Sequence, residues 1–262
     1  MLYLISTPIG NLKDITQRAI ETLQKIDVLF CEDTRVSLKL LKAYSIEKKL
    51  VSFHDHNEQD RLDLVEELLS QGKKVGLISD AGTPLISDPG YKLIKRCQEK
   101  RLAYTHIPGP SSVISALLLS GQPSYAFSFL GFVDEKKLSP WSSCQSSLIF
   151  FEAPHRLLES LHLLKLYFPN RGVSVVREIT KLYEECKKGT FEDVIAYYET
   201  NPPRGEICIV LGPPASLTHD YAEELKKLLI SKSIKDASKM ISDLYGVSKK
   251  EVYEKALEYK KA

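Results

Sequence analysis

Cysteine is scarce in this sequence and shows no regular spacing. The five cysteines stand far apart, at positions 31, 97, 144, 186 and 208, and no C-x-x-C pair occurs. This pattern excludes the common zinc-ribbon and dithiol redox motifs. An odd number of thiols, without a secretory leader at the N-terminus, predicts a reduced protein of the cytoplasm.

Several fingerprints of large enzyme classes are also missing. The sequence contains no G-x-G, no G-x-x-x-x-G-K-[ST], no H-E-x-x-H and no G-x-S-x-G. Ordinary dehydrogenases, P-loop NTPases, zincins and esterases with a nucleophile elbow are therefore excluded. No apolar run approaches the roughly 20 residues that a membrane-spanning helix needs, so we expect no contact with a membrane.

A strong excess of one charge is absent too. The 262 residues carry a net charge of +2, with 43% hydrophobic and 27% charged residues. This composition is that of an ordinary globular protein and not of a polycation that binds nucleic acid through its net charge. Any nucleic-acid site must therefore be a local patch.

The first 120 residues alternate short apolar runs with amphipathic stretches, which is typical of a largely parallel α/β sheet. Asp14 is the expected N-cap of the first helix. We predict strands at 2–6, 28–31, 50–53, 75–79 and 104–107, and helices at 16–26, 38–44, 60–70, 91–100 and 112–120.

The chain changes character after a break at 121–123. A polar loop at 135–147, anchored by Trp141, precedes a mixed sheet with a helix on one face. The expected elements are strands at 148–151, 173–179, 183–188 and 206–211 and a helix at 155–167. We therefore predict an α/β domain over residues 1–121 and a second one over 122–214.

Residues 215–262 are predicted to form a small helical unit. Helices are expected at 221–230, 235–244 and 249–259, and the last two flank Gly246-Val247-Ser248 with the spacing of a helix-turn-helix. From Leu217 onward ten lysines face eight acidic residues, which accounts for the net charge. The unit is either a packed structural bundle or a nucleic-acid-binding appendage.

Three predicted strands end in loops rich in Gly, Pro and hydroxyl groups. The loop at 6–16 follows the first strand, the loop at 79–90 the fourth and the loop at 108–112 the fifth. Loops at the carboxyl edge of an open α/β sheet form its ligand site, and a helix N-terminus there offers free N–H groups. We predict a binding cleft at this edge.

Ionisable residues also cluster after strands, at 32–35, 54–58, 152–156 and 177–181. His54 and His56 share one face of an extended backbone, but no third ligand stands near them, so no metal site is predicted. The clusters that flank the interdomain break suggest a substrate site, with surface ion pairing as the alternative.

Seven ordered motifs resemble the ribosomal RNA small subunit methyltransferase I family, a branch of the tetrapyrrole methylase superfamily that methylates a cytidine 2'-hydroxyl of 16S rRNA. The resemblance covers nearly the whole chain. The motifs are T-P-I-G-N-L-x-D-I-T-x-R-A, E-D-T-R, H-D-H-N-E, S-D-A-G-T-P-x-I-x-D-P-G, P-G-P-S-S, F-x-E-x-P-H-R and R-E-x-T-K.

The resemblance implies S-adenosylmethionine in a cleft between two α/β domains of the tetrapyrrole methylase type, a small C-terminal helical unit, and a homodimer. Its substrate would be 16S rRNA or the 30S subunit, methylated in the decoding region. Residues implied to line the cofactor are Pro8, Ile9, Asp80, Gly82, Thr83, Ser111, Ser112, Phe151 and Glu152. Candidate bases are His155, Glu152, Asp33 and Glu178, and candidate phosphate contacts are Arg35, Arg156, Arg177 and Lys181.

One segment departs from that family, because the residues after Gly131-Phe132 are fewer and poorer in arginine. Weaker phosphate contacts are expected from this loop. Two alternatives remain: a methylase acting on a tetrapyrrole or another small molecule, and a non-catalytic ribosome-assembly or RNA-binding factor with a vestigial pocket. The first loop disfavours the small-molecule methylase, since those relatives typically begin with G-x-G-P-G.

Overall fold

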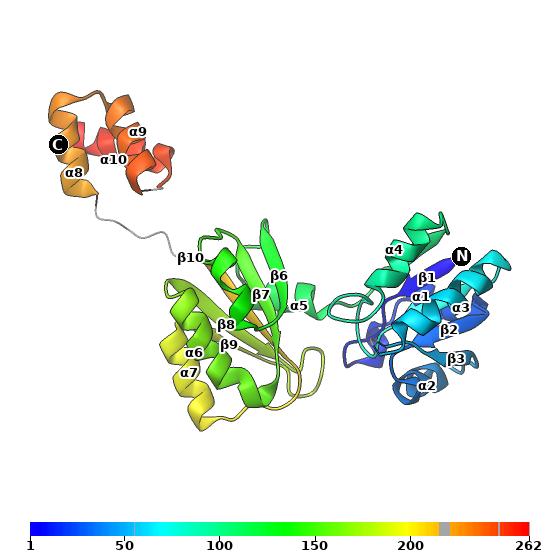
Figure 1. The fold of residues 1–262 in the computed structure, drawn as a ribbon. Coiled ribbons are helices and arrows are strands. Elements are labelled where there is room, and N and C mark those ends of the chain that lie inside the picture. Colours follow the sequence, from blue (N-terminus) through cyan, green and yellow to red (C-terminus); the bar gives the residue numbers. More distant parts are fainter. Residues whose placement is uncertain (55, 215–220, 246, 262) are drawn as a thin grey trace. The chain divides into compact units, whose positions relative to one another are not determined.

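The protein is described by a computed structural model that covers residues 1–54, 56–214, 221–245 and 247–261 (Figure 1). Contacts divide the chain into one unit of residues Met1–Pro213 and another of Pro214–Ala262. Among the described residues, every helix is too short or too polar to cross a lipid bilayer.

The first sheet has five parallel strands in the order β3-β2-β4-β1-β5. The predicted parallel sheet is thereby confirmed, because parallel strands covered on both faces read as short apolar runs. The strands are β1 (Leu2–Ile5), β2 (Val28–Cys31), β3 (Lys49–Ser52), β4 (Val75–Ile78) and β5 (Tyr104–Ile107).

Helices cover both faces of this sheet. On one face α1 (Gln17–Lys25) and α2 (Thr34–Ala43) pack in a cluster with Ile5. On the other face α3 (Glu58–Ser70) and α4 (Tyr91–Glu99) pack in a cluster with Leu2. Strand β1 thus contributes side chains to the cores on both faces of the sheet, as the alternation of side chains along a strand requires.

The start of two helices differs from expectation. Asp14 is not the N-cap of α1: it lies in a 3-10 turn, Leu12–Asp14, and Thr16 caps the helix by accepting a bond from the backbone N–H of Ala19 at 3.1 Å. Helix α2 begins four residues before the predicted position 38, because the Asp33 carboxylate accepts the N–H of Arg35 at 2.7 Å.

The second sheet is mixed, as predicted, with the order β6-β7-β10-β8-β9. Strand β7 pairs parallel with β6 and antiparallel with β10, and β8 pairs antiparallel with β9. The strands are β6 (Phe127–Phe132), β7 (Ser147–Glu152), β8 (Arg171–Arg177), β9 (Glu185–Gly189) and β10 (Ile207–Pro214). In the 135–147 segment, two 3-10 turns place Trp141 against the core, so the predicted anchor is confirmed.

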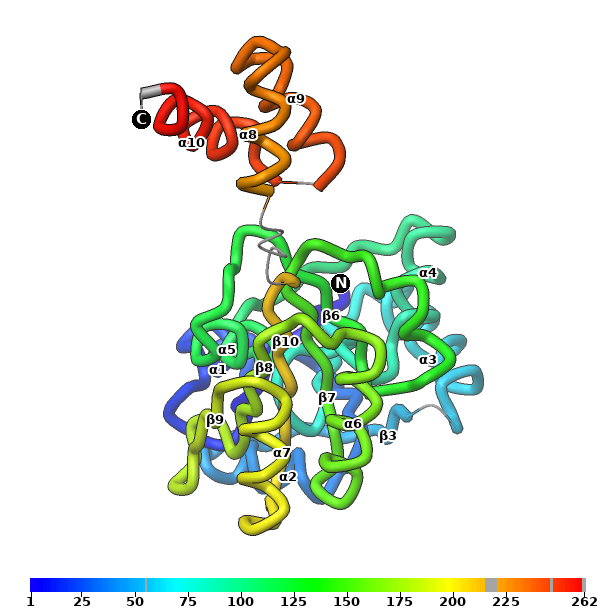
Figure 2. The backbone as a smooth tube through the Cα atoms, turned by 90° about the vertical axis from the view of Figure 1, so that its left-hand side faces the viewer, coloured from blue at the N-terminus to red at the C-terminus, as the bar shows by residue number. Residues whose placement is uncertain are grey.

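Two helices cover one face of this sheet, where one was predicted. A 3-10 turn, Pro154–Arg156, leads into α6 (Leu157–Tyr167), which lies beside α7 (Phe191–Thr200) in both ribbon and tube views (Figures 1 and 2). Helix α5 (Ser112–Ser120) packs on the opposite face through Val113, Ala116 and Leu117. The chain that leaves β5 therefore crosses directly onto the second sheet.

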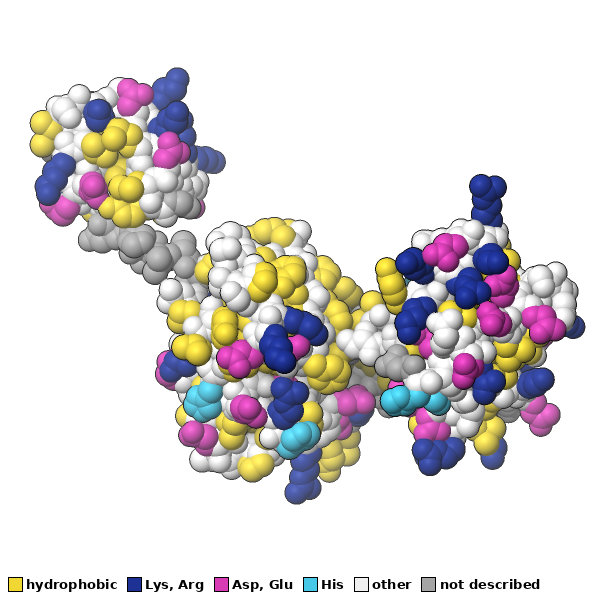
Figure 3. Space-filling model, viewed as in Figure 1, with side chains coloured by type: hydrophobic (Ala, Val, Ile, Leu, Met, Phe, Trp, Pro, Cys, Tyr) yellow, Lys and Arg dark blue, Asp and Glu magenta, His cyan; other side chains and the backbone are white. Residues whose placement is uncertain are grey.

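The C-terminal unit consists of α8 (Ala222–Ser231), α9 (Ile234–Tyr245) and α10 (Lys249–Lys261). Its core is formed by Leu225, Ala237, Ile241, Val252 and Ala256. Gly246 of the predicted helix-turn-helix lies outside the described residues. Lysines and acidic side chains are intermingled on the face that Figure 3 shows, in keeping with the small net charge.

Candidate functional site

The three loops at the carboxyl edge of the first sheet are bonded to one another. The Thr7 N–H donates to the Gly82 carbonyl at 2.8 Å, and the Thr83 hydroxyl donates to the Pro110 carbonyl at 3.0 Å. The Ser6 and Thr83 hydroxyl oxygens lie 3.1 Å apart. The loops after β1, β4 and β5 are therefore joined along one edge, as predicted from their positions at the carboxyl ends of parallel strands.

A cavity of about 350 Å³ lies between this edge and the second sheet. Seven of the nine predicted cofactor residues line it: Ile9, Gly82, Thr83, Ser111, Ser112, Phe151 and Glu152. Pro8 and Asp80 do not. Pro8 is buried in the first loop, and the Asp80 carboxylate accepts the N–H of Asp33 at 3.0 Å, so it holds the start of α2.

The walls of the cavity are largely apolar. Phe151 contributes a ring whose centroid lies 4.7 Å from that of Phe129 and 5.8 Å from that of Phe132. Cys208 also lines the wall, and burial raises the pKa of its thiol to about 12, so this thiol stays neutral at physiological pH. An apolar pocket with a few converging polar groups is the usual form of a small-molecule site.

Other residues that line the cavity were not predicted. They come from five segments: the rest of the 81–88 loop, the end of β6, Ala153 and Pro154 after β7, Ile179 after β8, and residues 205–208 at the start of β10. Ile86, Ser87 and Asp88 belong to the S-D-A-G-T-P-x-I-x-D-P-G motif of the loop at 79–90, so their position at the cavity could have been predicted from the sequence. Nothing in the sequence connects Gly205 and Glu206 with the first loop.

Glu152 is the candidate base that lines the cavity, yet its carboxylate is turned into the protein. It accepts bonds from the Ser160 hydroxyl and, at 2.7 Å, from the Ala153 N–H, and its side chain is 0% exposed. The Arg156 guanidinium lies 3.8 Å away. These contacts make Glu152 an anchor for the 152–156 segment.

Two other candidate bases are held in ion pairs. The Arg35 guanidinium bonds to Asp33 and lowers the pKa of that carboxyl to about 2. A bond from Lys181 lowers the pKa of Glu178, with a further bond from the Glu206 N–H. Carboxylates of lowered pKa accept protons poorly. His155 is exposed and directly follows Ala153 and Pro154 at the cavity wall.

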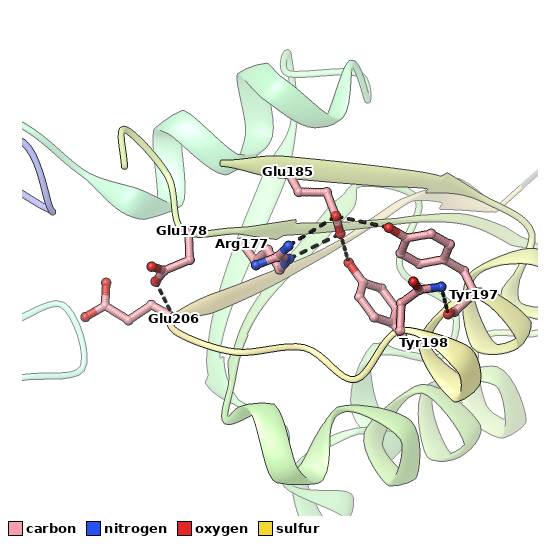
Figure 4. A network of polar contacts seen from close by, with 7 residues as sticks. Arg177, Glu178, Glu185, Tyr197, Tyr198 and Glu206 are labelled. Carbon is pink, nitrogen blue, oxygen red and sulfur yellow. Dashed lines mark hydrogen bonds and ion pairs between the residues drawn. The ribbon is translucent and has the colours of Figure 1, made fainter. Parts of the chain in front are cut away.

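Arg177 belongs to a polar network on the second sheet, on the side of α7 (Figure 4). Glu185 accepts bonds from the Arg177 guanidinium at 3.2 Å, from the Tyr198 hydroxyl at 2.9 Å and from the Tyr197 hydroxyl at 3.1 Å. Burial alone would raise the pKa of Glu185, but these bonds outweigh burial and lower it. The Arg177 guanidinium is thus paired with a carboxylate of the protein itself.

Replacing Glu185 by glutamine is expected to lower the free energy of unfolding by about 1–2 kcal/mol at pH 7, because bonds between charged partners are lost. The Glu185 pKa is lower in the folded protein, so its contribution is present above the unfolded pKa of about 4.3 and is lost as pH falls further. Urea unfolding at pH 7 and pH 3.5 measures this. Glu199→Gln, at an exposed position of α7, should change neither value.

The remaining candidate phosphate contacts differ in how freely their charges can be used. The Lys181 ammonium lies 2.9 Å from Glu178 and 3.1 Å from Glu206. Arg156 donates to the Val133 carbonyl at 3.1 Å and is partly exposed. The side chain of Arg35 is 86% exposed, and an exposed ion pair such as Arg35 with Asp33 contributes little energy.

The histidine pair follows β3, and the centroids of the His54 and His56 rings lie 5.9 Å apart. Asp55 between them lies outside the described residues. Asn57 precedes α3, but its side chain bonds to Ser52 and to His54 instead of capping the helix. In the part of the chain that the structure describes, no three His, Cys, Asp or Glu side chains converge as metal ligands.

Comparison with known proteins places this architecture in a family. The model of the Tetrapyrrole (Corrin/Porphyrin) Methylases matches residues 1–195. The chain is similar to Ribosomal RNA small subunit methyltransferase I of Rickettsia prowazekii (strain Madrid E), with 40% identity over 97% of this chain and 93% of the relative. The protein of the same name from Bacillus subtilis (strain 168) is 37% identical over 97% and 93%.

Solved structures show the same fold at low identity. A cobalt precorrin-4 methyltransferase of cobalamin biosynthesis is matched with a TM-score of 0.62 and 18% identity, over 80% of this chain and 94% of that one. Diphthine synthase is matched with a TM-score of 0.63 and 15% identity, over 81% and 90%. The chain therefore belongs to the tetrapyrrole methylase family and, within it, to the ribosomal RNA small subunit methyltransferase I family.

Proposed function

We propose that this protein transfers a methyl group from S-adenosylmethionine to the ribose 2'-hydroxyl of a cytidine in the decoding region of 16S rRNA. The observation that carries the proposal is the cavity, which is lined by residues of five of the seven motifs that indicate the family: the three loops, the end of β7 with the segment after it, and Ile179 after β8. Relatives named as small-subunit rRNA methyltransferases, similar over nearly the full chain, support the choice of substrate.

The cavity residues fit S-adenosylmethionine chemically. Ile9, Ile179 and Phe151 offer an apolar wall for an adenine ring, and the hydroxyls of Thr83, Ser111 and Ser112 suit polar groups. Gly82 has a backbone φ of 78°, and a Cβ added there would lie 3.1 Å from Ile9 Cγ2, so the loop has a glycine where the two segments approach closely. Methyl donation and a neutral sulfide leaving group come from the cofactor when it is bound.

The protein's own part in the reaction is to orient the ribose hydroxyl and to accept its proton. Among the four candidate bases, Asp33 and Glu178 are ion-paired and Glu152 is enclosed. His155 is exposed beside the cavity wall, so we assign proton acceptance to its imidazole. Glu152 and Ser160 then hold the segment that presents it.

RNA phosphates are proposed to bind Arg35 and Arg156. Both guanidinium groups are at least partly exposed, and both follow strands of the α/β unit. Planar guanidinium groups hold phosphates through paired hydrogen bonds. Arg177 and Lys181 remain candidates from the sequence, but their side chains are paired with carboxylates and are only 21% and 28% exposed.

A homodimer and a cytoplasmic location complete the proposal. Helix α5 exposes Ile114 and Leu118 one turn apart, which suits an apolar contact with a second copy. Sedimentation of the purified protein tests the dimer. All five cysteines are free thiols, in agreement with a reducing compartment.

The proposal is tested by offering tritiated S-adenosylmethionine with naked 16S rRNA, free 30S subunits and a tetrapyrrole precursor. Label in either RNA substrate is expected, and comparison of the two shows whether the enzyme needs an assembled subunit. A methylated 2'-hydroxyl blocks alkaline cleavage at that nucleotide, so the label should appear in an alkali-resistant dinucleotide. Label only in the tetrapyrrole would overturn the choice of substrate, and no calorimetric binding of S-adenosylmethionine would overturn methyl transfer altogether.

A further inference from the structure

The turn that follows β8 has an unusual backbone. Glu178 and Thr180 have φ angles of 51° and 65°, in the left-handed region. Residues other than glycine rarely adopt this region, and a β-branched residue such as Thr180 does so least of all. Such a conformation persists only where the surrounding contacts hold it, and it tends to occur at functional sites.

Contacts within the second sheet hold the turn on one side. The Glu178 carboxylate accepts a hydrogen bond from the Lys181 ammonium at 2.9 Å and another from the Glu206 N–H at 3.0 Å. Lys181 also pairs with the Glu206 carboxylate. Figure 4 shows Glu178 and Glu206. Gly205 leaves the space for this arrangement, because a Cβ added there would lie 2.0 Å from Glu178 Oε1. The turn is thereby fixed to the start of β10.

On its other side the turn contacts the first loop of the first sheet. The Thr180 hydroxyl donates to the Asp14 carboxylate at 2.8 Å, across 166 positions of sequence. The stem of Lys181 lies over Gly10, where an added Cβ would come within 2.6 Å of Lys181 Cγ and 2.7 Å of Cε. Gly10 has a φ of 152°, so both its conformation and its close contact favour glycine.

We propose that residues 178–181 form a positioning clamp, which holds the loop at 9–14 against the second sheet. The clamp thereby sets the width of the 350 Å³ cavity that is proposed to bind S-adenosylmethionine. The clamp joins three segments that line this cavity: Ile9, Ile179, and Gly205 with Glu206. This inference rests on the proposed function only in naming the occupant of the cavity as S-adenosylmethionine.

The charges around the clamp argue for positioning rather than for RNA binding. Lys181 contributes one positive charge, whereas Glu178, Glu206 and Asp14 contribute three negative ones. The set is therefore net negative and repels phosphate. Lys181 stabilises the turn instead of offering a free cation to RNA.

The first test replaces Gly10 by alanine and measures the affinity for S-adenosylmethionine by calorimetry. The added methyl group displaces the Lys181 stem, so we expect binding to weaken about 10- to 100-fold. Combining Gly10→Ala with Lys181→Ala removes the conflict and should recover part of that loss, a rescue that general destabilisation would not give. Gly72→Ala is the matched control, because Gly72 also has a positive φ but nothing lies within 4 Å of its added Cβ.

The second test needs no ligand. Amide hydrogen exchange at Asp14 and Ile15 should be at least about tenfold faster in Lys181→Ala and in Thr180→Val than in the wild type. The wild-type protein could bind no S-adenosylmethionine while the two substitutions still accelerate hydrogen exchange. The clamp would then be supported, and the assignment of S-adenosylmethionine to the cavity would be wrong. Unchanged exchange in both variants would overturn the clamp. Lys181→Ala could instead weaken RNA binding while hydrogen exchange and the affinity for S-adenosylmethionine stay unchanged. That result would make Lys181 a phosphate contact and would also overturn the clamp.

Discussion

Replacing His155 by alanine is expected to lower the rate of methyl transfer by about 10² to 10⁴. The reason is that a ribose hydroxyl is a weak acid and a poor nucleophile until its proton is accepted. His155 is the exposed candidate at the cavity wall, next to Ala153 and Pro154. Single-turnover transfer of tritiated methyl to the 30S subunit or to 16S rRNA, whichever the enzyme accepts, measures the rate of the chemical step.

The affinity for the donor provides the internal control for this substitution. The His155 ring does not line the cavity, so binding of S-adenosylmethionine by His155→Ala should stay within about twofold of the wild type, since only an interaction of the transition state is lost. His162→Ala removes an exposed histidine from α6 and should leave the rate unchanged. Added imidazole should restore part of the activity of His155→Ala. A variant that keeps its full rate would move proton acceptance to another group.

The parts of the fold that sequence could predict are those whose burial is set locally. Strand β2 and helix α5 begin and end at the predicted residues, because a run of apolar residues bounded by polar or Gly/Pro-rich loops determines each of them. Strand β5 also has the predicted bounds, although it reads Tyr-Thr-His-Ile; its end is marked by Pro108 and Gly109. Helix α7 was missed although its signal was present: Thr190 and Asp193 form a capping box just before an apolar run. Strand β6 was missed because its exposure follows no alternating pattern.

For the site, sequence could predict which loops meet but not what lies across from them. Parallel strands bring their carboxyl ends to one edge, so loops that follow such strands are expected to meet there, as Gly82, Thr83 and Ser111 do. The pairing of Arg177 with Glu185 depends on the register of β8 and β9, where these residues are opposite one another. The bond between Thr180 and Asp14 depends on how the two sheets pack, about which local patterns carry no information.

The largest effect on stability is expected at Arg171, the first residue of β8, which is 4% exposed. Its guanidinium donates to the carbonyls of Ser146 and Gly212, both at 2.8 Å, and to that of Cys144. The same group lies 5.3 Å from the centroid of the Phe168 ring. Burial lowers the pKa of Arg171, but the guanidinium stays charged because its ordinary pKa is so high. This side chain therefore ties β8, β10 and the segment before β7 together.

Arg171→Met is expected to lower the free energy of unfolding by about 3–5 kcal/mol, because each bond from a charged donor contributes about 1.5–3 kcal/mol and the losses are not fully additive. A buried ion pair can be replaced by apolar residues at little cost, since both charges leave together. Here the partners are backbone carbonyls, which remain in place and lose their donors. Denaturant unfolding measures the loss, with Arg101→Met at an exposed position as the control. Arg171→Lys should recover only part of the loss, because an ammonium lacks the planar fork that reaches three carbonyls. A loss below about 1 kcal/mol in Arg171→Met would show that water replaces the guanidinium at these carbonyls.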